Sequence, residues 1–267
     1  MPEDPMQKVK TIILKEWAEV FKNRMVVFSV IFMPLLFTAL PLIFLFATRD
    51  AGLSESNSDL PPQFARLCSP ELTGGQCFQV YMSSQMMILF MMMPLIIPAN
   101  IAAYSIVGEK TTRSLEPLLA TPITTAELVT GKNLAAMIPA VLATWLGFGI
   151  YAIGAWIIVQ DGRVMRALFD PMWMLAVFVA GPLLAILSVN FSIMVSSRVN
   201  DPRVAEQLSA VVIVPLLAIF FGQISGLFFL NSLLILLFSA VLLLIDAGVV
   251  YLAVRLFQRE TILTRWK

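Results

Sequence analysis

The chain has 267 residues, of which 59% are hydrophobic and 13% are charged, and its mean hydropathy is +0.86. Soluble domains carry about 25% charged residues, so this composition excludes an ordinary soluble globule, a disordered chain and a coiled coil. The net charge of +1 and the absence of histidine also exclude a field that attracts nucleic acid and any histidine-based catalytic or metal site.

Residues 1–24 form an amphipathic segment ahead of the first apolar stretch. Its apolar side chains recur every three or four residues, while Lys and Glu occupy the other faces. The apolar positions are Met6, Val9, Ile13, Trp17 and Val20. This pattern predicts an interfacial helix anchored by Trp17, which acts as a cytoplasmic elbow leading into the membrane.

Long stretches without a charged residue follow, and they predict the fold class. About 20 apolar helical residues cross a bilayer core, and the last apolar stretch, at 207–254, is long enough for two crossings. We therefore expect an all-α integral membrane protein with six transmembrane helices over 25–257. The predicted spans are 25–47, 81–107, 134–159, 172–197, 208–226 and 233–254.

The segment 222–232 separates the last two spans. Gly222, Gln223, Ser225, Gly226, Asn231 and Ser232 interrupt its apolar character. Non-helical backbone at membrane depth needs cover from protein or water. We expect either a short break or a re-entrant segment at this point.

The distribution of Lys and Arg predicts the orientation. Of these residues, 14 fall on the side of both termini, including the tail 258–267, and 4 fall on the other side. The positive-inside rule then places both termini in the cytoplasm and the chain in the cell (inner) membrane. Cys68 and Cys77 would lie in the outer loop 48–80. A disulfide suits that oxidising side, and two free thiols are the alternative.

The cytoplasmic loop 108–133 is the most informative segment between spans. Glu109 stands four residues before Arg113 and Glu116 stands three after it, which favours one charged helical face. An apolar ridge follows at Leu115, Leu118 and Leu119. Farther on, Thr124 and Glu127 form a capping box that predicts a helix start leading into the third span. An exposed ridge of this kind fits a protein partner or the lipid surface equally well.

Three polar side chains inside the predicted spans are candidates for a substrate path. Asp246 is the ionisable one, and Asn190 and Asn100 lie at a similar depth. An intramembrane carboxylate is a functional candidate by default. A structural hydrogen bond between helices, with Asp246 protonated, is the alternative.

The loop and the N-terminal segment resemble those of the type-two ABC exporter permeases. The residues that carry the resemblance are Glu109, Arg113, Ser114, Leu115, Glu116, Pro117, Leu118, Leu119, Pro122, Glu127, Leu128, Gly131 and Lys132, together with Lys15-Glu16-Trp17 and Lys22-Asn23-Arg24. The six-span layout with both ends inside agrees with that family. The resemblance therefore covers nearly the whole chain.

The resemblance implies a half-permease that pairs with a second copy or a related subunit and with two separate cytoplasmic ATPases. The loop between the second and third spans would be a coupling helix docked in an ATPase groove. Its contact residues would be Glu109, Arg113, Leu115, Glu116, Leu118 and Leu119. No phosphate-binding Gly-rich motif occurs in this chain, so ATP and magnesium are expected on the partner, and the chain itself holds no cofactor or metal and is not an enzyme.

Two other functions are compatible with the sequence. An ion-coupled secondary transporter would use Asp246 as a proton carrier, and a non-transporting scaffold would bind a soluble protein through the loop. Internal inverted repeats would favour the secondary transporter, and the sequence shows no convincing one. The substrate is not encoded in any recognisable motif.

Overall fold

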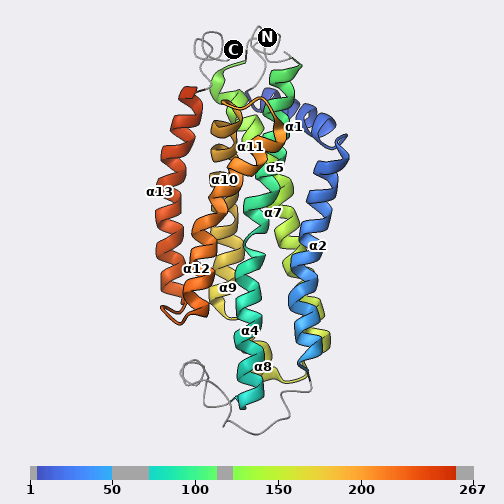
Figure 1. The fold of residues 1–267 in the computed structure, drawn as a ribbon, viewed down its shortest axis with the longest axis vertical. Coiled ribbons are helices and arrows are strands. Elements are labelled where there is room, and N and C mark those ends of the chain that lie inside the picture. The colour runs from blue at the N-terminus through green and yellow to red at the C-terminus, as the bar shows by residue number, and fades with distance from the viewer. Residues whose placement is uncertain (1–4, 50–71, 113–122, 257–267) are drawn as a thin grey trace.

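The computed structural model describes residues 5–49, 72–112 and 123–256, and this part of the chain contains helices and no strand (Figure 1). Within it, six helical segments are long and apolar enough to cross a membrane. They run side by side as one elongated bundle, with the short helix α1 (Pro5–Val20) across one end. The predicted all-α membrane fold with six spans is confirmed.

The membrane-length segments follow the predicted spans with longer ends. In chain order they are α2 (Arg24–Ala47), α4 and α5 (Gly74–Phe90, Met93–Thr111), α7 (Thr125–Ile158), α8, α9, η3 and α10 (Gly162–Leu168, Pro171–Leu175, Ala176–Ala180, Gly181–Ser196), α11, η4 and α12 (Pro202–Ser209, Ala210–Ile213, Val214–Ile224), and α13 (Ser232–Leu256). Three of these segments are therefore built from more than one helix.

Capping explains two of the helix starts. Thr124 and Glu127 form the predicted capping box at the start of α7. Thr73 and Gln76 form a second capping box at the start of α4, which makes 74–80 helical although these residues were expected in the outer loop. Satisfied N-terminal N–H groups stabilise a helix at this point, so α4 begins at the Gly-Gly pair that follows Thr73.

The second and fourth spans contain irregular turns near their middle. Between α4 and α5 the helix breaks at Met91 and Met92, and Pro94 stands in the first turn of α5, where its missing N–H costs nothing. In the fourth span, η3 is a turn of π-helix. The indole N–H of Trp145 donates to the Val177 carbonyl at 3.3 Å and so satisfies a backbone group within this turn.

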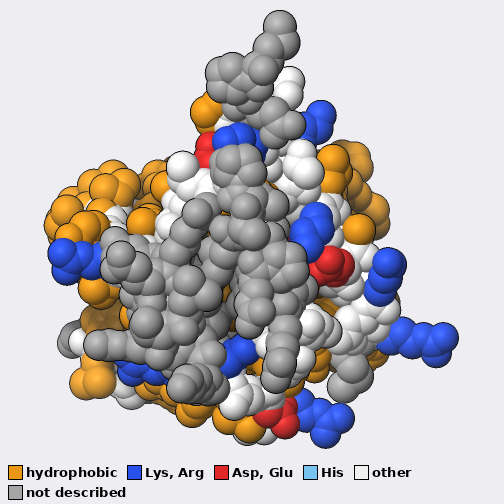
Figure 2. Space-filling view, turned by 90° about the horizontal axis from the view of Figure 1, so that it is seen from above, with side chains coloured by type: hydrophobic (Ala, Val, Ile, Leu, Met, Phe, Trp, Pro, Cys, Tyr) orange, Lys and Arg blue, Asp and Glu red, His pale blue; other side chains and the backbone are white. Residues whose placement is uncertain are grey.

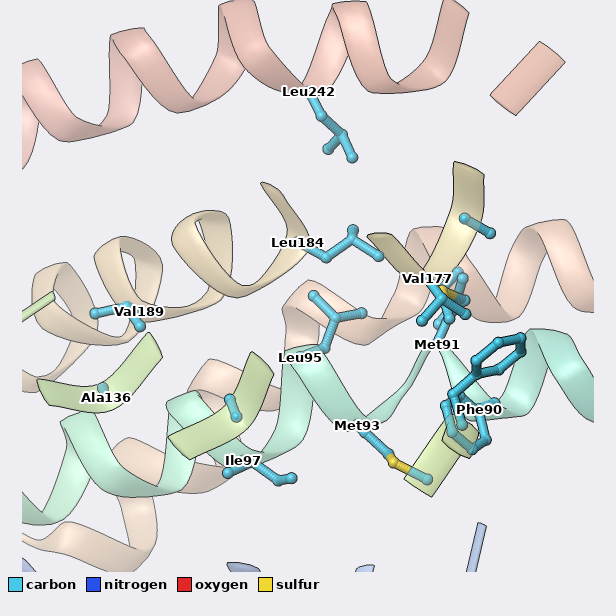
Figure 3. Packing of buried hydrophobic residues seen from close by; sticks show 14 of the residues in the cluster. Phe90, Met91, Met93, Leu95, Ile97, Ala136, Val177, Leu184, Val189 and Leu242 are labelled. Carbon is cyan, nitrogen blue, oxygen red and sulfur yellow. The ribbon is translucent and has the colours of Figure 1, made fainter. Parts of the chain in front are cut away.

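The core of the bundle is formed by α5 and α10, which pack extensively on each other. Figure 3 shows Leu95 of α5 next to Leu184 of α10, with Leu242 of α13 pointing toward them. By contrast, α2, α12 and α13 are buried on one side and carry exposed apolar side chains on the other. That arrangement suits helices in contact with lipid or with a second membrane subunit.

Glycines of α7 allow α2 to approach closely. A Cβ atom at Gly154 would lie 2.6 Å from Leu42, and one at Gly147 would lie 2.8 Å from Thr38 Oγ1. Contacts this short leave no room for a side chain, so both positions fix how α2 packs on α7.

The connection between α12 and α13 is a short non-helical turn, in the described residues 225–231. Gly226 has a φ of 73°, a value that glycine adopts without strain. Phe228 then folds back over Gly222, where a Cβ atom would lie 2.6 Å from its ring. The expected interruption is therefore a break that turns back onto the bundle, with no helix of its own.

Candidate coupling site

A buried cluster of opposite charges joins α1, α5 and α7 at the end of the bundle that carries α1. The Nζ atom of Lys132 lies 2.7 Å from Glu16 Oε1 and 2.7 Å from Glu109 Oε2. Lys132 also donates to Ser105 Oγ at 3.1 Å, and the Ser105 hydroxyl donates to Glu16. Lys15 Nζ reaches the other oxygen of Glu109 at 2.5 Å. We call these five side chains the stem cluster.

The central charges of the stem cluster are almost completely removed from solvent. Glu16 and Glu109 are each 3% exposed and Lys132 is 4% exposed. Burying an isolated charge is costly, but each of these three charges has opposite charges or hydroxyl groups within hydrogen-bond distance. With Lys15 included, the cluster contains two ammonium groups and two carboxylates, so its formal charges cancel.

The sequence brings α1 onto α7 through close packing beside the charges. A Cβ atom at Gly131 would lie 2.7 Å from Ile12 Cγ2, so only glycine lets α1 lie this near. One turn away, the indole N–H of Trp17 donates to the Ala135 carbonyl at 2.8 Å. Trp17 therefore fastens α1 to α7 through a hydrogen bond, in addition to any contact that it makes with the membrane interface.

The stem cluster links the two helices that flank the predicted cytoplasmic loop. Glu109 lies in the last turn of α5, and Lys132 lies two turns into α7. These two helices flank residues 112–124, so the Glu109–Lys132 pair fixes the spacing of the two stems of the loop. Next to it, Lys110 donates to the carbonyls of Ser197 and Val199 at 3.3 and 3.4 Å. A displacement of the loop would thus be transmitted to α1, α5, α7 and the end of α10.

The predicted coupling residues fall into two groups. Arg113, Leu115, Glu116, Leu118 and Leu119 lie outside the described residues. Glu109 is described, and its expected place on an exposed face with Arg113 is wrong, because Lys132 and Lys15 bind its carboxylate in the interior. Glu109 therefore supports the base of the loop and is not available to contact a partner directly.

The three substrate-path candidates are buried on three different helices. Asn100 lies on α5, Asn190 on α10 and Asp246 on α13. Asn190 accepts a hydrogen bond from Asn133 of α7 at 3.1 Å and donates to the Ile186 carbonyl at 2.9 Å. Both carboxylate oxygens of Asp246 are buried without a hydrogen-bond partner among the residues described. No hydrogen bond therefore links Asp246 to Asn190 or Asn100 among the described residues, and Asn190 bonds instead to Asn133 of α7 and to its own helix.

Polar contacts also fix the opposite end of the bundle. Gln76 Nε2 donates to Asp161 Oδ2 at 2.7 Å, and Arg163 pairs with the same carboxylate at 3.1 Å. Hydrogen bonds from the Arg163 side chain and backbone, with the charge of Arg163 and the bond from Gln76, lower the pKa of Asp161 to about 2. Cys77 of α4 is disulfide-bonded. Cys68 lies outside the described residues, so the pairing with Cys68 stays a prediction.

Sequence reasoning missed most of the stem cluster. Lys15 and Glu16 entered as polar positions of the amphipathic segment and, with Lys132, as parts of the family resemblance. Ser105 was not singled out, nor was Asn133, which lies outside the cluster. The partners are far apart in sequence: Glu109 stands 94 positions after Lys15, and Lys132 stands 116 positions after Glu16. Local periodicity carries no information about such pairs. One signal in the sequence could have predicted ion pairs between these helices. Lys and Glu stand at those ends of the apolar spans that lie on the same side of the membrane.

Comparison with known proteins assigns the family. No individual curated protein matches the sequence. The family described as ABC-2 family transporter protein matches residues 10–256, a range that includes all six membrane-length segments and the stem cluster. The chain therefore belongs to the ABC-2 family of transporter membrane proteins and is a permease component of an ABC transporter.

Proposed function

We propose that this chain is the membrane subunit of an ATP-driven exporter, which works as a dimer of permease subunits with separate cytoplasmic ATPases. The chain belongs to a transporter family, and the observation that carries the proposal is its stem cluster. This cluster joins α1 to α5 and α7, the two helices that flank residues 113–122. The family match favours ATP over an ion gradient as the energy source. ATP and magnesium would bind to the partner ATPase.

The charge distribution supports a cytoplasmic position for this end. Figure 2 looks onto it and shows Lys and Arg side chains around the rim, with hydrophobic side chains on the flanks. The described basic residues at this end are Lys8, Lys10, Lys15, Lys22, Arg24, Lys110, Lys132, Arg198, Arg203 and Arg255. Those at the opposite end are Arg49, Arg163 and Arg166. By the positive-inside rule, the loop 112–124 and α1 would face the cytoplasm of the cell, in the inner membrane.

The coupling step follows from the geometry of the stems. An ATPase that moves residues 113–122 also moves the ends of α5 and α7, since the Glu109–Lys132 pair holds them together. Lys15 and Glu16 pass that motion to α1, which continues through a short turn into α2. Rearrangement of α2 against the second permease subunit would then open the path outward.

The test is reconstitution with an ABC ATPase from the same organism, beginning with any that a neighbouring gene encodes. We expect the two proteins to co-purify in lipid nanodiscs, and we expect ATP hydrolysis to be faster in the complex than for the ATPase alone. Exchanging Lys132 for methionine should uncouple this stimulation, while Arg163→Met, a matched change at the opposite end, should not. Failure of the ATPase to bind the wild-type chain would contradict the proposal. An ion gradient that drives transport without any ATPase would instead support the secondary transporter based on Asp246.

A further inference from the structure

An apolar cavity lies in the half of the bundle farthest from α1. Its volume is about 270 Å³, and α4, α9, η3, α10, α12 and α13 line it with hydrophobic side chains. Phe228 and Leu234 stand at its edge and are 38% and 40% exposed. These exposed edge residues indicate that the cavity opens to the side of the bundle, toward the hydrocarbon of the membrane.

Three irregular parts of the backbone converge on this cavity. Met91 comes from the break between α4 and α5, Ala176 and Ala180 come from the π-helical turn η3, and Phe228 comes from the turn between α12 and α13. Figure 3 shows Met91 and Val177 close together where the first two of these features meet. π-helical turns occur frequently at functional sites. Small side chains at 176 and 180 leave the space that a regular helix with larger residues would fill.

A second, more polar cavity of about 130 Å³ adjoins the first. Leu230 lines both of them, and Met172 and Trp173 line one each as neighbours in α9. Gln223 lines the smaller cavity, is 6% exposed, and has its Oε1 atom buried without a hydrogen-bond partner in the described part of the chain. A buried amide oxygen without a hydrogen bond destabilises the fold, and a ligand that donates a hydrogen bond to Gln223 Oε1 would remove this cost.

We propose that the two cavities form one binding site for a single-chain amphipathic molecule. Its alkyl chain occupies the larger cavity, and its small uncharged head group donates a hydrogen bond to Gln223. The larger cavity, at about 270 Å³ and lined by hydrophobic side chains, has room for one short alkyl chain. A two-chain phospholipid is too large for it. The site is independent of the direction of transport and of ATP.

The experiment uses photocrosslinking of the purified full chain in nanodiscs. The probe is a medium-chain alkanol with a diazirine on its chain, and it is compared with its methyl ether and with a diazirine-bearing phosphatidylcholine. Mass spectrometry of the labelled peptides locates the crosslinks. We expect the alkanol to label the segments around Met91 and Ala180, the methyl ether to label them less, and the phosphatidylcholine to label only outward-facing surfaces.

Matched variants separate the cavity from the lipid-facing surface. Ala180→Leu fills the larger cavity and should abolish cavity labelling. Leu216→Phe fills it from α12 and gives the same readout if the first variant does not fold. Ala247→Leu makes the same change on an exposed position of α13 and should leave labelling intact. Gln223→Leu should remove the preference for the alkanol over its methyl ether.

Two results would overturn the proposal. One is cavity labelling that persists in both filled variants, which would place the probe elsewhere. The other is equal labelling by phosphatidylcholine and alkanol, which would make the cavity a site for bulk lipid. Neither result depends on an ATPase, so failure here is distinguishable from failure of the proposed transport function.

Discussion

Replacing Lys132 by methionine removes the central ammonium group of the stem cluster and keeps most of its volume. Glu109 retains Lys15 at 2.5 Å, but Glu16 keeps only Ser105 and a Lys15 nitrogen at 3.9 Å. Glu16 is 3% exposed, so its charge is stranded in the interior. Removing one partner of a buried pair costs about 3–5 kcal/mol. At roughly 2–4 °C per kcal/mol for a chain of this size, the melting temperature should fall by roughly 6–20 °C.

The assay is thermal unfolding of the purified chain in one detergent, followed by size-exclusion chromatography of the heated samples. Adding Glu16→Gln to Lys132→Met neutralises the stranded carboxylate, so the double variant should melt well above the single one. Arg166→Met, at an exposed side chain of the opposite end, should change the melting temperature little. If Lys132→Met melts like the wild type, or if the double variant melts lower than the single one, the buried charges of the stem cluster do not stabilise the fold.

Four further predictions concern other parts of the chain. Leu118→Asp, outside the described residues, should leave the permease inserted but reduce its co-purification with the ATPase and abolish stimulated ATP hydrolysis. An unchanged complex with normal stimulation would refute docking of the ATPase at the apolar ridge of the loop. Cys68 and Cys77 should resist a membrane-impermeant thiol reagent added from outside until a reductant is supplied, whereas labelling without reductant would show free thiols. Asp246→Asn separates the two roles of this carboxylate in vesicles assayed at two pH values. A residue on the substrate path requires transport to stop while assembly with the ATPase stays intact, and wild-type transport would remove Asp246 from the pathway. The pKa of Asp161 is about 2 instead of its ordinary 3.8, so the ionised carboxylate stabilises the fold above pH 4 and this contribution is lost as the pH falls toward 2. Asp161→Asn should therefore flatten the acid dependence of the melting temperature between pH 4 and pH 2. An acid profile like that of the wild type would contradict this.

The spans could be predicted because their signal is local. A charge-free apolar stretch must become a helix in lipid, where every backbone polar group needs an internal partner, and α2 and α13 match their predicted ranges within two residues. The capping box at Thr124 was visible for the same reason, since its two partners stand three residues apart.

The interior of the site could not be read from the sequence. Glu16 lies among the polar positions of an amphipathic pattern, yet the structure buries it, because Lys132 from a distant helix meets it there. The π-helical turn was hidden for a related reason, since Ala176–Ala180 has the composition of any apolar helix. Both features depend on which helices become neighbours, and that information is not contained in local periodicity.

The central claim is that residues 113–122 and the stem cluster couple this permease to an ATPase. The most direct measurement is purification of the chain from its native membrane at natural expression level, with native mass spectrometry for subunit composition and an assay of ATP hydrolysis. The account predicts permease and ABC ATPase subunits in equal numbers, in a complex that hydrolyses ATP. A chain that is recovered free of any ATPase, in preparations that hydrolyse no ATP, would contradict it.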